Sequence, residues 1–364
     1  MDETRTPKYI QLKQEILRWL QEGKYKPEER IPSENEIAER FGVSRQTVRQ
    51  TLGELEVEGW LQRMRGKGTF VSPLRPGNRD GKRIGMLTTY ISDYIFPHIV
   101  RGAEAAVRRR GYSLLLSSTD NDKARELDCL RQMLGQSPCG LLVEPTKSAM
   151  GNTNLPYFLE LTRQGVPMVM LHARYPEWYG PCVMVNDERG GYLATEHLLA
   201  LGHTRVAGFF KTDDLQGVGR LKGYLSAHRK RGMTVDPSFV VRYETETVHE
   251  VAIAAALDLL RRPGRPTALV CYNDQLAVKI LDAVRQTGLT VPGDVSVVGF
   301  DDSPLATATE TKLTTLSHPK EELGMKAAEM LLDLVERRQG EAEDIVYEPE
   351  LIVRDSTAAP PPAP

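Results

Sequence analysis

The sequence predicts an α/β protein in which a small helical N-terminal domain precedes a larger body of doubly wound parallel sheets. Three observations support this fold class. Charge-dense segments with helical spacing fill residues 1–72, linker-like composition follows over 73–82, and apolar runs typical of strands then alternate with amphipathic helices over 83–356. The Pro/Ala-rich residues 357–364 are expected to form a disordered tail. A chain of 364 residues is long enough for such a division.

The first domain is predicted to contain short helices followed by a β-hairpin. Ser33 and Glu36 have the spacing of a capping box at the start of a helix. Gly42 can adopt the left-handed conformation that ends this helix, and Ser44 can cap the next one. Two strand-like runs, at 60–63 and 69–71, then flank a basic tip that contains glycine.

Two elements of this domain carry basic residues without any acid between them. Residues 44–53 and 62–72 contain no Asp or Glu, although acids are frequent elsewhere in the first 72 residues. In the helix after Gly42, the apolar stripe leaves Arg45, Gln46, Arg49 and Gln50 facing outward. Such residues are also common on ordinary solvated faces, but two acid-free basic elements favour a DNA-binding surface. Since the formal net charge is −2, any such binding depends on local segregation of charge.

The body has apolar strand-like runs that end directly in polar residues. These runs lie at 84–88, 113–118, 140–143, 167–171, 205–210, 267–271 and 295–299. Ligands of open α/β sheets bind at the carboxyl edge of the strands, so these polar residues are candidate ligand groups. The pattern is too long for one sheet domain, and we expect two lobes that face each other across a cleft. The expected lobes are approximately 83–182 plus 318–338, and 183–317 plus 339–356.

Several classes of function lack support in the sequence. No apolar run is long enough to span a membrane and the N-terminus is polar, so we expect no signal peptide and a cytoplasmic protein. The four cysteines are dispersed singly, which favours buried thiols over disulfides or a metal site. Gly217, Gly219 and Gly223 are spaced one residue too widely for a dinucleotide loop. We therefore expect no cofactor, no metal and no enzymatic activity.

Residues 7–71 resemble the winged helix-turn-helix of GntR-family transcription factors. The matching positions include 31–34, 43–49, 58–59 and 66–71, while Glu28 stands where the family often has glycine. The resemblance implies operator DNA as a partner, with the helix after Gly42 in the major groove and the hairpin tip on phosphates or the minor groove. The candidate DNA-binding residues are Lys8, Ser33, Glu34, Ser44, Arg45, Gln46, Thr47, Arg49, Arg63, Arg65, Gly66 and Lys67.

The body resembles the effector-binding domain of LacI-family repressors and sugar-binding periplasmic proteins. The most specific match is at 291–302, and further matches lie at 83–85, 220–224, 265–268, 272–274 and 313–315. The resemblance implies that Arg220 and Asp301 hold a sugar in the cleft and that Asn273 contributes an amide. Arg220 on a helix surface, Asp301 as a turn cap and Asn273 in a local turn are the alternatives.

Other residues can complete such a site. Tyr90, Phe96 and Trp178 are candidates for an aromatic wall, although most aromatic residues are simply core. Glu144 and His172 follow strands of the first lobe and can add polar groups, although a single histidine is more often structural.

A GntR-type head on a LacI-type body implies a sugar-responsive transcriptional repressor that dimerises. By this resemblance the effector is arabinose (L-arabinose) or a related pentose, and its binding releases the protein from operator DNA. A homodimer is expected because one helix and wing reach few base pairs. An activator, a regulator of another small molecule, and a sugar-modifying enzyme that uses Asp274, Asp301 or Asp302 remain alternatives.

Overall fold

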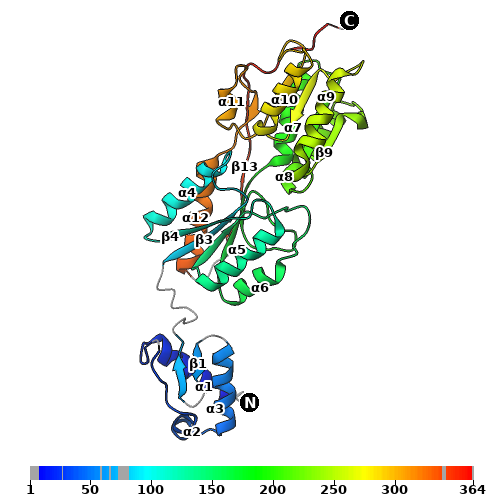
Figure 1. Ribbon diagram of the computed structural model, residues 1–364. Coiled ribbons are helices and arrows are strands. Elements are labelled where there is room, and N and C mark those ends of the chain that lie inside the picture. The colour runs from blue at the N-terminus through cyan, green and yellow to red at the C-terminus, as the bar shows by residue number, and fades with distance from the viewer. Residues whose placement is uncertain are drawn as a thin grey trace, which may run out of the picture. The chain divides into compact units, whose positions relative to one another are not determined.

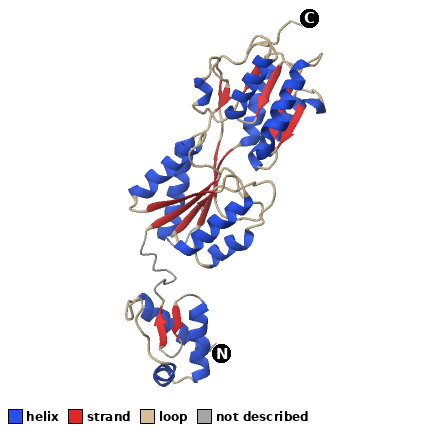
Figure 2. Cartoon of the chain, viewed as in Figure 1, coloured by secondary structure: helices blue, strands red, loops and turns tan. Residues whose placement is uncertain are grey.

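The chain forms two units, residues 1–80 and 81–364, in the computed structural model (Figure 1). The structure describes residues 8–26, 28–57, 60–64, 67–72, 82–337 and 342–362. Most of the expected linker, 73–81, lies outside these ranges. Figure 2 shows the predominantly helical first unit and the alternating strands and helices of the second unit, as the α/β pattern predicts.

The N-terminal unit consists of helices around a small apolar core and an antiparallel hairpin. Its elements are α1 (Lys8–Gln21), α2 (Glu34–Phe41), α3 (Arg45–Val57), β1 (Leu61–Met64) and β2 (Gly68–Val71). The hairpin pairs Leu61 with Val71 and Met64 with Gly68. Apolar residues of all five elements meet in one core, which positions α3 against α1 and the hairpin.

The caps predicted for the helix pair are present. The Ser33 hydroxyl accepts from the Glu36 amide, and the Glu36 carboxylate accepts from the Ser33 amide at 2.7 Å. Gly42 ends α2 with a φ of 59°, in the left-handed region. The amide of Thr47 donates to the Ser44 hydroxyl at 3.1 Å, which fixes the first turn of α3. These bonds define the sharp turn between α2 and α3.

The first lobe of the second unit is a six-stranded parallel sheet with helices on both faces. Its strand order is β13-β7-β6-β5-β3-β4. One face carries α4 and α12, which pack against each other, and the other carries α5 and α6 (Figure 1). The bounds are β3 (Arg83–Thr88), α4 (Phe96–Arg109), β4 (Ser113–Ser118), α5 (Lys123–Gln136), β5 (Gly140–Val143), α6 (Leu155–Arg163), β6 (Met168–Leu171), β7 (Cys182–Val185), α12 (Lys320–Arg337) and β13 (Ile345–Tyr347).

The second lobe has a four-stranded parallel sheet of order β11-β10-β8-β9. Helices α7 and α8 approach each other so closely that a side chain at Gly191 or Gly223 would collide with the backbone of the other helix. The bounds are α7 (Asp187–Ala200), β8 (Val206–Lys211), α8 (Leu215–Lys230), β9 (Val240–Tyr243), the π-helix η3 (Val248–Ile253), α9 (Ala254–Arg261), β10 (Ala268–Cys271), α10 (Asp274–Gln286), β11 (Ser296–Val298), α11 (Leu305–Ala308), β12 (Thr315–Leu316) and β14 (Leu351–Ile352). Short 3-10 turns η1 (Pro237–Phe239) and η2 (Thr245–Thr247) flank β9.

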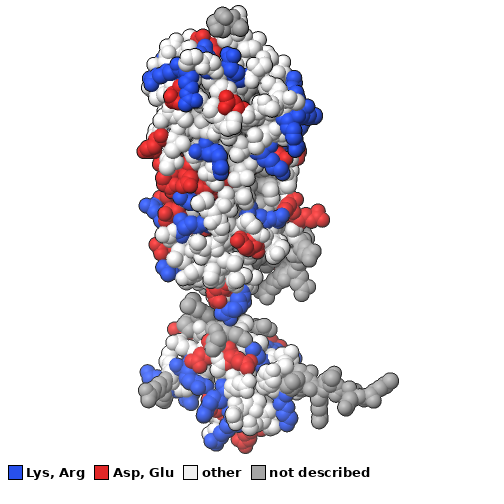
Figure 3. All heavy atoms as spheres, turned by 90° about the vertical axis from the view of Figure 1, so that its right-hand side faces the viewer, with Lys and Arg blue, Asp and Glu red and all other residues white. Residues whose placement is uncertain are grey.

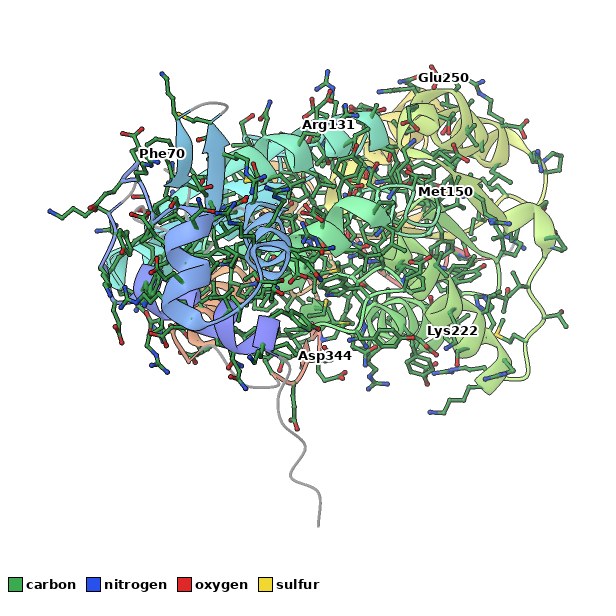
Figure 4. All side chains as sticks on the ribbon, turned by 90° about the horizontal axis from the view of Figure 1, so that it is seen from below. Phe70, Arg131, Met150, Lys222, Glu250 and Asp344 are labelled. Atoms are coloured by element: carbon green, nitrogen blue, oxygen red, sulfur yellow. The ribbon has the colours of Figure 1, made fainter. Side chains whose placement is uncertain are left out.

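The expected lobe boundaries need correction at two strands. Both β7 and β13 were assigned almost wholly to the second lobe, but they pair with each other in the sheet of the first lobe. The carboxylate of Asp344, labelled in Figure 4, accepts from the Cys182 amide at 3.0 Å and holds β13 at this edge. The chain therefore passes between the lobes after β7, after β12 and after β13.

The expected disorder of 357–364 is wrong for the part of the tail that the structure describes. The Ala358 carbonyl accepts from His203 Nε2 at 2.9 Å, and its amide donates to Ser296 Oγ at 3.0 Å. The Thr357 hydroxyl lies 3.0 Å from His197 Nε2. The Pro/Ala composition did not predict these bonds, because backbone groups, which do not depend on side-chain type, make most of them. Residues 363 and 364 lie outside the described ranges.

Charged side chains of both signs are interspersed over the face of the second unit seen in Figure 3. Within the described ranges, no helix has the length and hydropathy needed to cross a membrane. The same residues contain no cluster of three or more His, Cys, Asp or Glu that could hold a metal ion.

Candidate functional site

The N-terminal unit presents the predicted basic face of α3 to solvent. Arg45, Gln46 and Arg49 are exposed, while Val48 and Leu52 are buried in the core below them. The side chains of Arg45 and Gln46 have no hydrogen-bond or ion-pair partner in the described part of the chain. They are therefore available to meet base edges or phosphates.

Glu34 connects the helix and the hairpin through two arginines. Its carboxylate accepts from Arg49 Nη2 at 3.0 Å and from Arg63 Nη2 at 3.1 Å. The hydrogen bond that Arg49 donates to Glu34 raises the pKa of Arg49 above its ordinary value. Because Arg49 belongs to α3 and Arg63 to β1, Glu34 holds two candidate DNA contacts near each other.

The remaining candidates of the N-terminal unit divide into capping residues and exposed cations. Ser33 and Ser44 are occupied as helix caps, and the Thr47 hydroxyl lies 2.8 Å from the Ser44 hydroxyl. Lys8 and Lys67 are exposed. Arg65 and Gly66 lie outside the described residues. No contact with DNA is tested by this geometry, so the DNA-binding roles stay predictions.

A cavity of about 260 Å³ lies between the two lobes of the second unit. Its walls come from the carboxyl ends of strands in both sheets, where the sequence predicted a ligand site. Among the aromatic candidates, Trp178 does not line it and packs instead against Phe158 in the first lobe. The other seven effector-binding candidates all line it: Tyr90, Phe96, Glu144, His172, Arg220, Asn273 and Asp301.

Arg220 is a buried cavity residue held by several partners, not a surface arginine. Its Nε donates to Asp187 at 2.8 Å and its Nη2 donates to Asp301 at 3.3 Å. Its guanidinium also lies 3.6 Å from the centroid of the Phe300 ring. Burial alone would lower the pKa of Arg220, but Asp187 and Asp301 raise it above its ordinary value. The cavity therefore contains a permanently charged, oriented fork of donors.

Asp301 is fixed from both lobes. Its Oδ1 accepts from Arg220, and its Oδ2 accepts from the Tyr94 hydroxyl at 2.7 Å. The backbone of Asp301 has a φ of 93°, and that of His172 has a φ of 62°. Each such conformation costs a residue other than glycine roughly 1–3 kcal/mol. Local strain thus accompanies two cavity residues that follow strands of different lobes.

Glu144 and His172 form a buried pair in the first lobe. Glu144 Oε1 lies 2.9 Å from His172 Nδ1, and its other oxygen accepts from the Thr89 amide at 2.8 Å. Burial would raise the pKa of Glu144, but the bonds from His172 and Thr89 lower it on balance. Burial likewise opposes charge on His172, yet its bond to Glu144 raises the pKa of the imidazole. The pair keeps a carboxylate and a histidine at the cavity wall.

The aromatic and amide candidates have structural roles as well. Tyr90 and Phe96 pack edge-on with ring centroids 5.4 Å apart and form one wall of the cavity. Asn273 Oδ1 accepts from the Leu276 amide at 2.9 Å and caps α10, as the local-turn alternative proposed. Its amide nitrogen remains a potential donor to a ligand.

Several polar cavity residues were missed by the sequence analysis. Lys211 and Asp214 form an ion pair of 3.1 Å at the end of β8, and the Tyr272 hydroxyl donates to Asp214 at 2.7 Å. Lys211 followed a predicted strand, so its position could have been used, whereas His318 follows only the two-residue strand β12. Other missed lining residues are Tyr94, Asn121, Asp187, Gln216, Tyr243, Gln275 and Lys279.

Comparison with known proteins agrees with this architecture. Residues 8–71 match bacterial regulatory proteins of the gntR family, and residues 195–357 match the periplasmic binding protein-like domain. The chain is 55% identical to the arabinose metabolism transcriptional repressor of Geobacillus stearothermophilus over 98% of its length and 99% of that protein. The chain belongs to the family of arabinose metabolism transcriptional repressors.

A second arabinose metabolism transcriptional repressor, from Halalkalibacterium halodurans, is 43% identical over 96% of each chain. Among solved structures, a LacI family transcriptional regulator from Enterococcus faecium with bound ribose is 26% identical, with a TM-score of 0.67. That match covers 76% of this chain and 99% of the solved chain. These comparisons confirm the resemblance of the N-terminal domain to GntR-family proteins and of the body to LacI-family proteins.

Proposed function

We propose that this protein represses genes for arabinose use and that L-arabinose releases it from operator DNA. The observation that carries the proposal is the 55% identity to an arabinose repressor along nearly the entire chain. The N-terminal unit binds the operator through α3 and the hairpin. The cavity of the second unit binds the sugar through Arg220, Asp301 and the Glu144–His172 pair.

The size and chemistry of the cavity support a pentose. A volume of about 260 Å³ lies just below the usual range of small-molecule sites, which suits a ligand with few heavy atoms. Arg220 and Asp301 provide charged donors and acceptors in this cavity, and Tyr90 and Phe96 line it with aromatic rings on which the apolar face of a sugar can lie. The related Enterococcus regulator was solved with ribose, another pentose.

Binding to DNA is proposed to require a homodimer in the cytoplasm. One α3 helix covers few base pairs, and a two-fold pair of heads doubles the recognised sequence. Because the proposed partner is operator DNA, we propose that the protein acts in the cytoplasm. The four cysteines are buried and no disulfide joins them, which is compatible with that reducing compartment.

Closure of the lobes is the proposed link between sugar and DNA. Bonds across the cleft include Tyr94 to Asp301 at 2.7 Å, Asn121 to Thr245 at 2.7 Å and Lys147 to Glu246 at 2.6 Å. A sugar that binds the closed lobes more tightly shifts the population toward them. The two effects are reciprocal. If sugar lowers the affinity for operator DNA by some factor, operator DNA must lower the affinity for sugar by the same factor.

The enzymatic alternative has less support. Asp274 is buried with its oxygens bonded to Thr315 and Ser303, and Asp302 accepts from Arg354. Asp301 is held by Arg220 and Tyr94. Each candidate acid thus has a structural partner, and we propose binding without chemical conversion of the sugar.

A thermal-shift screen of pentoses and hexoses, followed by operator titration, tests the proposal. Sugar at 100 times its dissociation constant should stabilise the second unit by about 2.7 kcal/mol. L-arabinose should give the largest shift and should weaken operator binding. A larger shift with another sugar would identify that sugar as the effector. Full operator affinity in saturating arabinose would contradict release by arabinose.

A further inference from the structure

Two buried histidines from distant parts of the chain meet at the wall of the sugar cavity. His172 follows β6 in the first lobe, and His318 lies where the chain returns from β12 to α12. Their ring centroids are 5.2 Å apart and their planes are inclined by 71°. His172 is 8% exposed and His318 is 7% exposed. The two rings are therefore close neighbours in a site largely closed to solvent.

Each ring has a nitrogen that the protein leaves without a partner. Neither His172 Nε2 nor His318 Nδ1 has a hydrogen-bond partner among the described residues. Buried polar atoms are nearly always paired, by protein, water or ligand. Two unpaired nitrogens on adjacent rings of residues that line one cavity can be satisfied by a polar group of the ligand.

The surroundings of the two rings favour opposite protonation states. Burial opposes a charge on His172, but the bond to Glu144 raises its pKa and favours the imidazolium. Burial holds the pKa of His318 well below its ordinary value, and the charges of His172, Lys320 and Arg220 lower it further. An imidazolium donates from both nitrogens, whereas a neutral imidazole has one acceptor. The pair can therefore offer one donor and one acceptor.

We infer that one hydroxyl of the bound sugar lies between the two histidines, where it accepts from His172 Nε2–H and donates to His318 Nδ1. An oxygen at a normal distance of roughly 2.8 Å from each nitrogen can bridge atoms up to about 5.6 Å apart. The ring centroids are 5.2 Å apart, so nitrogens on sides of the rings that face each other lie within this reach. The result is a continuous chain of bonds from Glu144 through His172 and the sugar to His318, in which each bond polarises the next.

This arrangement makes the pair a specificity-determining element for a hydroxyl group. A hydroxyl donates and accepts at once, whereas a methylene does neither and an ether or carbonyl oxygen only accepts. A deoxygenated sugar leaves both buried nitrogens unpaired, and sites of this kind reject such analogues strongly. The inference rests on the proposed function, because it assigns one contact of the proposed sugar.

The test measures binding of L-arabinose and each of its monodeoxy analogues by calorimetry. It compares the full-length wild type with His318→Phe, which keeps a ring but removes both ring nitrogens. His318→Asn is the conservative variant, because its amide oxygen can still accept from the hydroxyl. His228→Phe makes the same exchange at a buried histidine of α8 that does not line the cavity.

The wild type should bind one analogue at least tenfold more weakly because a charge-assisted bond is lost. His318→Phe should bind arabinose more weakly and lose the His318 part of its discrimination at that single position, while the bond from His172 and the penalties at the other hydroxyls persist. His318→Asn should restore part of the discrimination, and His228→Phe should retain all of it.

Undiminished penalties at every hydroxyl in His318→Phe would overturn the inference and leave the proposed effector intact. Equal loss at all positions would overturn it too, because it would indicate general damage to the cavity. Absence of arabinose binding to the wild type would instead overturn the proposed effector, together with the contact assigned to it.

Discussion

The hydroxyl of Tyr94, in the first lobe, donates to the carboxylate of Asp301, in the second lobe, at 2.7 Å. The same hydroxyl lies 3.0 Å from the Phe300 carbonyl. Asp301 also binds Arg220, so this contact joins lobe closure to the group proposed to bind the sugar. A bond across the cleft is made only when the lobes are closed, and its energy therefore favours that state.

Tyr94→Phe should weaken lobe closure and hence sugar binding. Loss of these hydrogen bonds removes about 1 kcal/mol from the closed form, which corresponds to roughly fivefold weaker arabinose binding. Calorimetry measures this change directly. Tyr112→Phe, on the same lobe but away from the cavity, is the control and should bind normally. Equal affinities of Tyr94→Phe and wild type would show that this bond does not contribute to closure.

Arg220→Lys should yield a repressor that responds only weakly to sugar. The ammonium keeps a positive charge near Asp187 and Asp301, but it lacks the planar fork that binds both at once. Arabinose affinity should fall at least tenfold, while operator affinity should stay within twofold. Titration of labelled operator with and without arabinose measures both effects. Retained release by sugar would argue against a central role of Arg220.

Arg45→Ala should weaken operator binding without affecting the sugar site. Arg45 is exposed on α3. Its removal should cost about 1–3 kcal/mol in operator affinity by fluorescence anisotropy. Arg18→Ala removes a cation from α1 that pairs with Glu15 and is the matched control. If both variants lost the same affinity, general electrostatic attraction would explain the result better than recognition by α3.

Asp274→Asn should reduce the pH dependence of stability. Burial raises the pKa of Asp274 to about 7. Since this is above its unfolded value, Asp274 stabilises the fold fully at low pH, and this contribution is lost as pH rises through about 7. Asparagine can accept from the Ser303 amide and donate to the Thr315 hydroxyl, and it carries no charge. We compare the free energies of unfolding of the variant and the wild type, measured in urea. The difference in favour of the variant should grow by about 2–3 kcal/mol between pH 5 and pH 8. Parallel pH curves would contradict this.

Local chemistry made the N-terminal unit predictable in detail. The Ser33–Glu36 capping box and Gly42 involve only residues that are close together in the sequence. Their spacing therefore indicated the turn directly. The carboxyl-edge rule similarly brought Glu144, His172 and Asp301 to one cavity. These predictions needed only the order of strands and helices along the chain.

Features that depend on distant pairing were not predictable in this way. Strand β13 reads as a short exposed segment, and only its pairing with β7 places it in the first lobe. Tyr94 and His318 lie outside long strands, so no rule about strand ends selects them. Their place at the cavity arises from the return of the chain between the lobes.

The repeated passage of the chain between the lobes also affects the order in which the protein can be completed during synthesis. Helix α12 and strand β13 finish the first lobe, and residues 356–358 bind β11 in the second. Neither lobe can reach its final packing until nearly the whole chain has left the ribosome. The N-terminal unit is complete after residue 72 and can fold first. A nascent chain can thus acquire its helix-turn-helix well before it can sense a sugar.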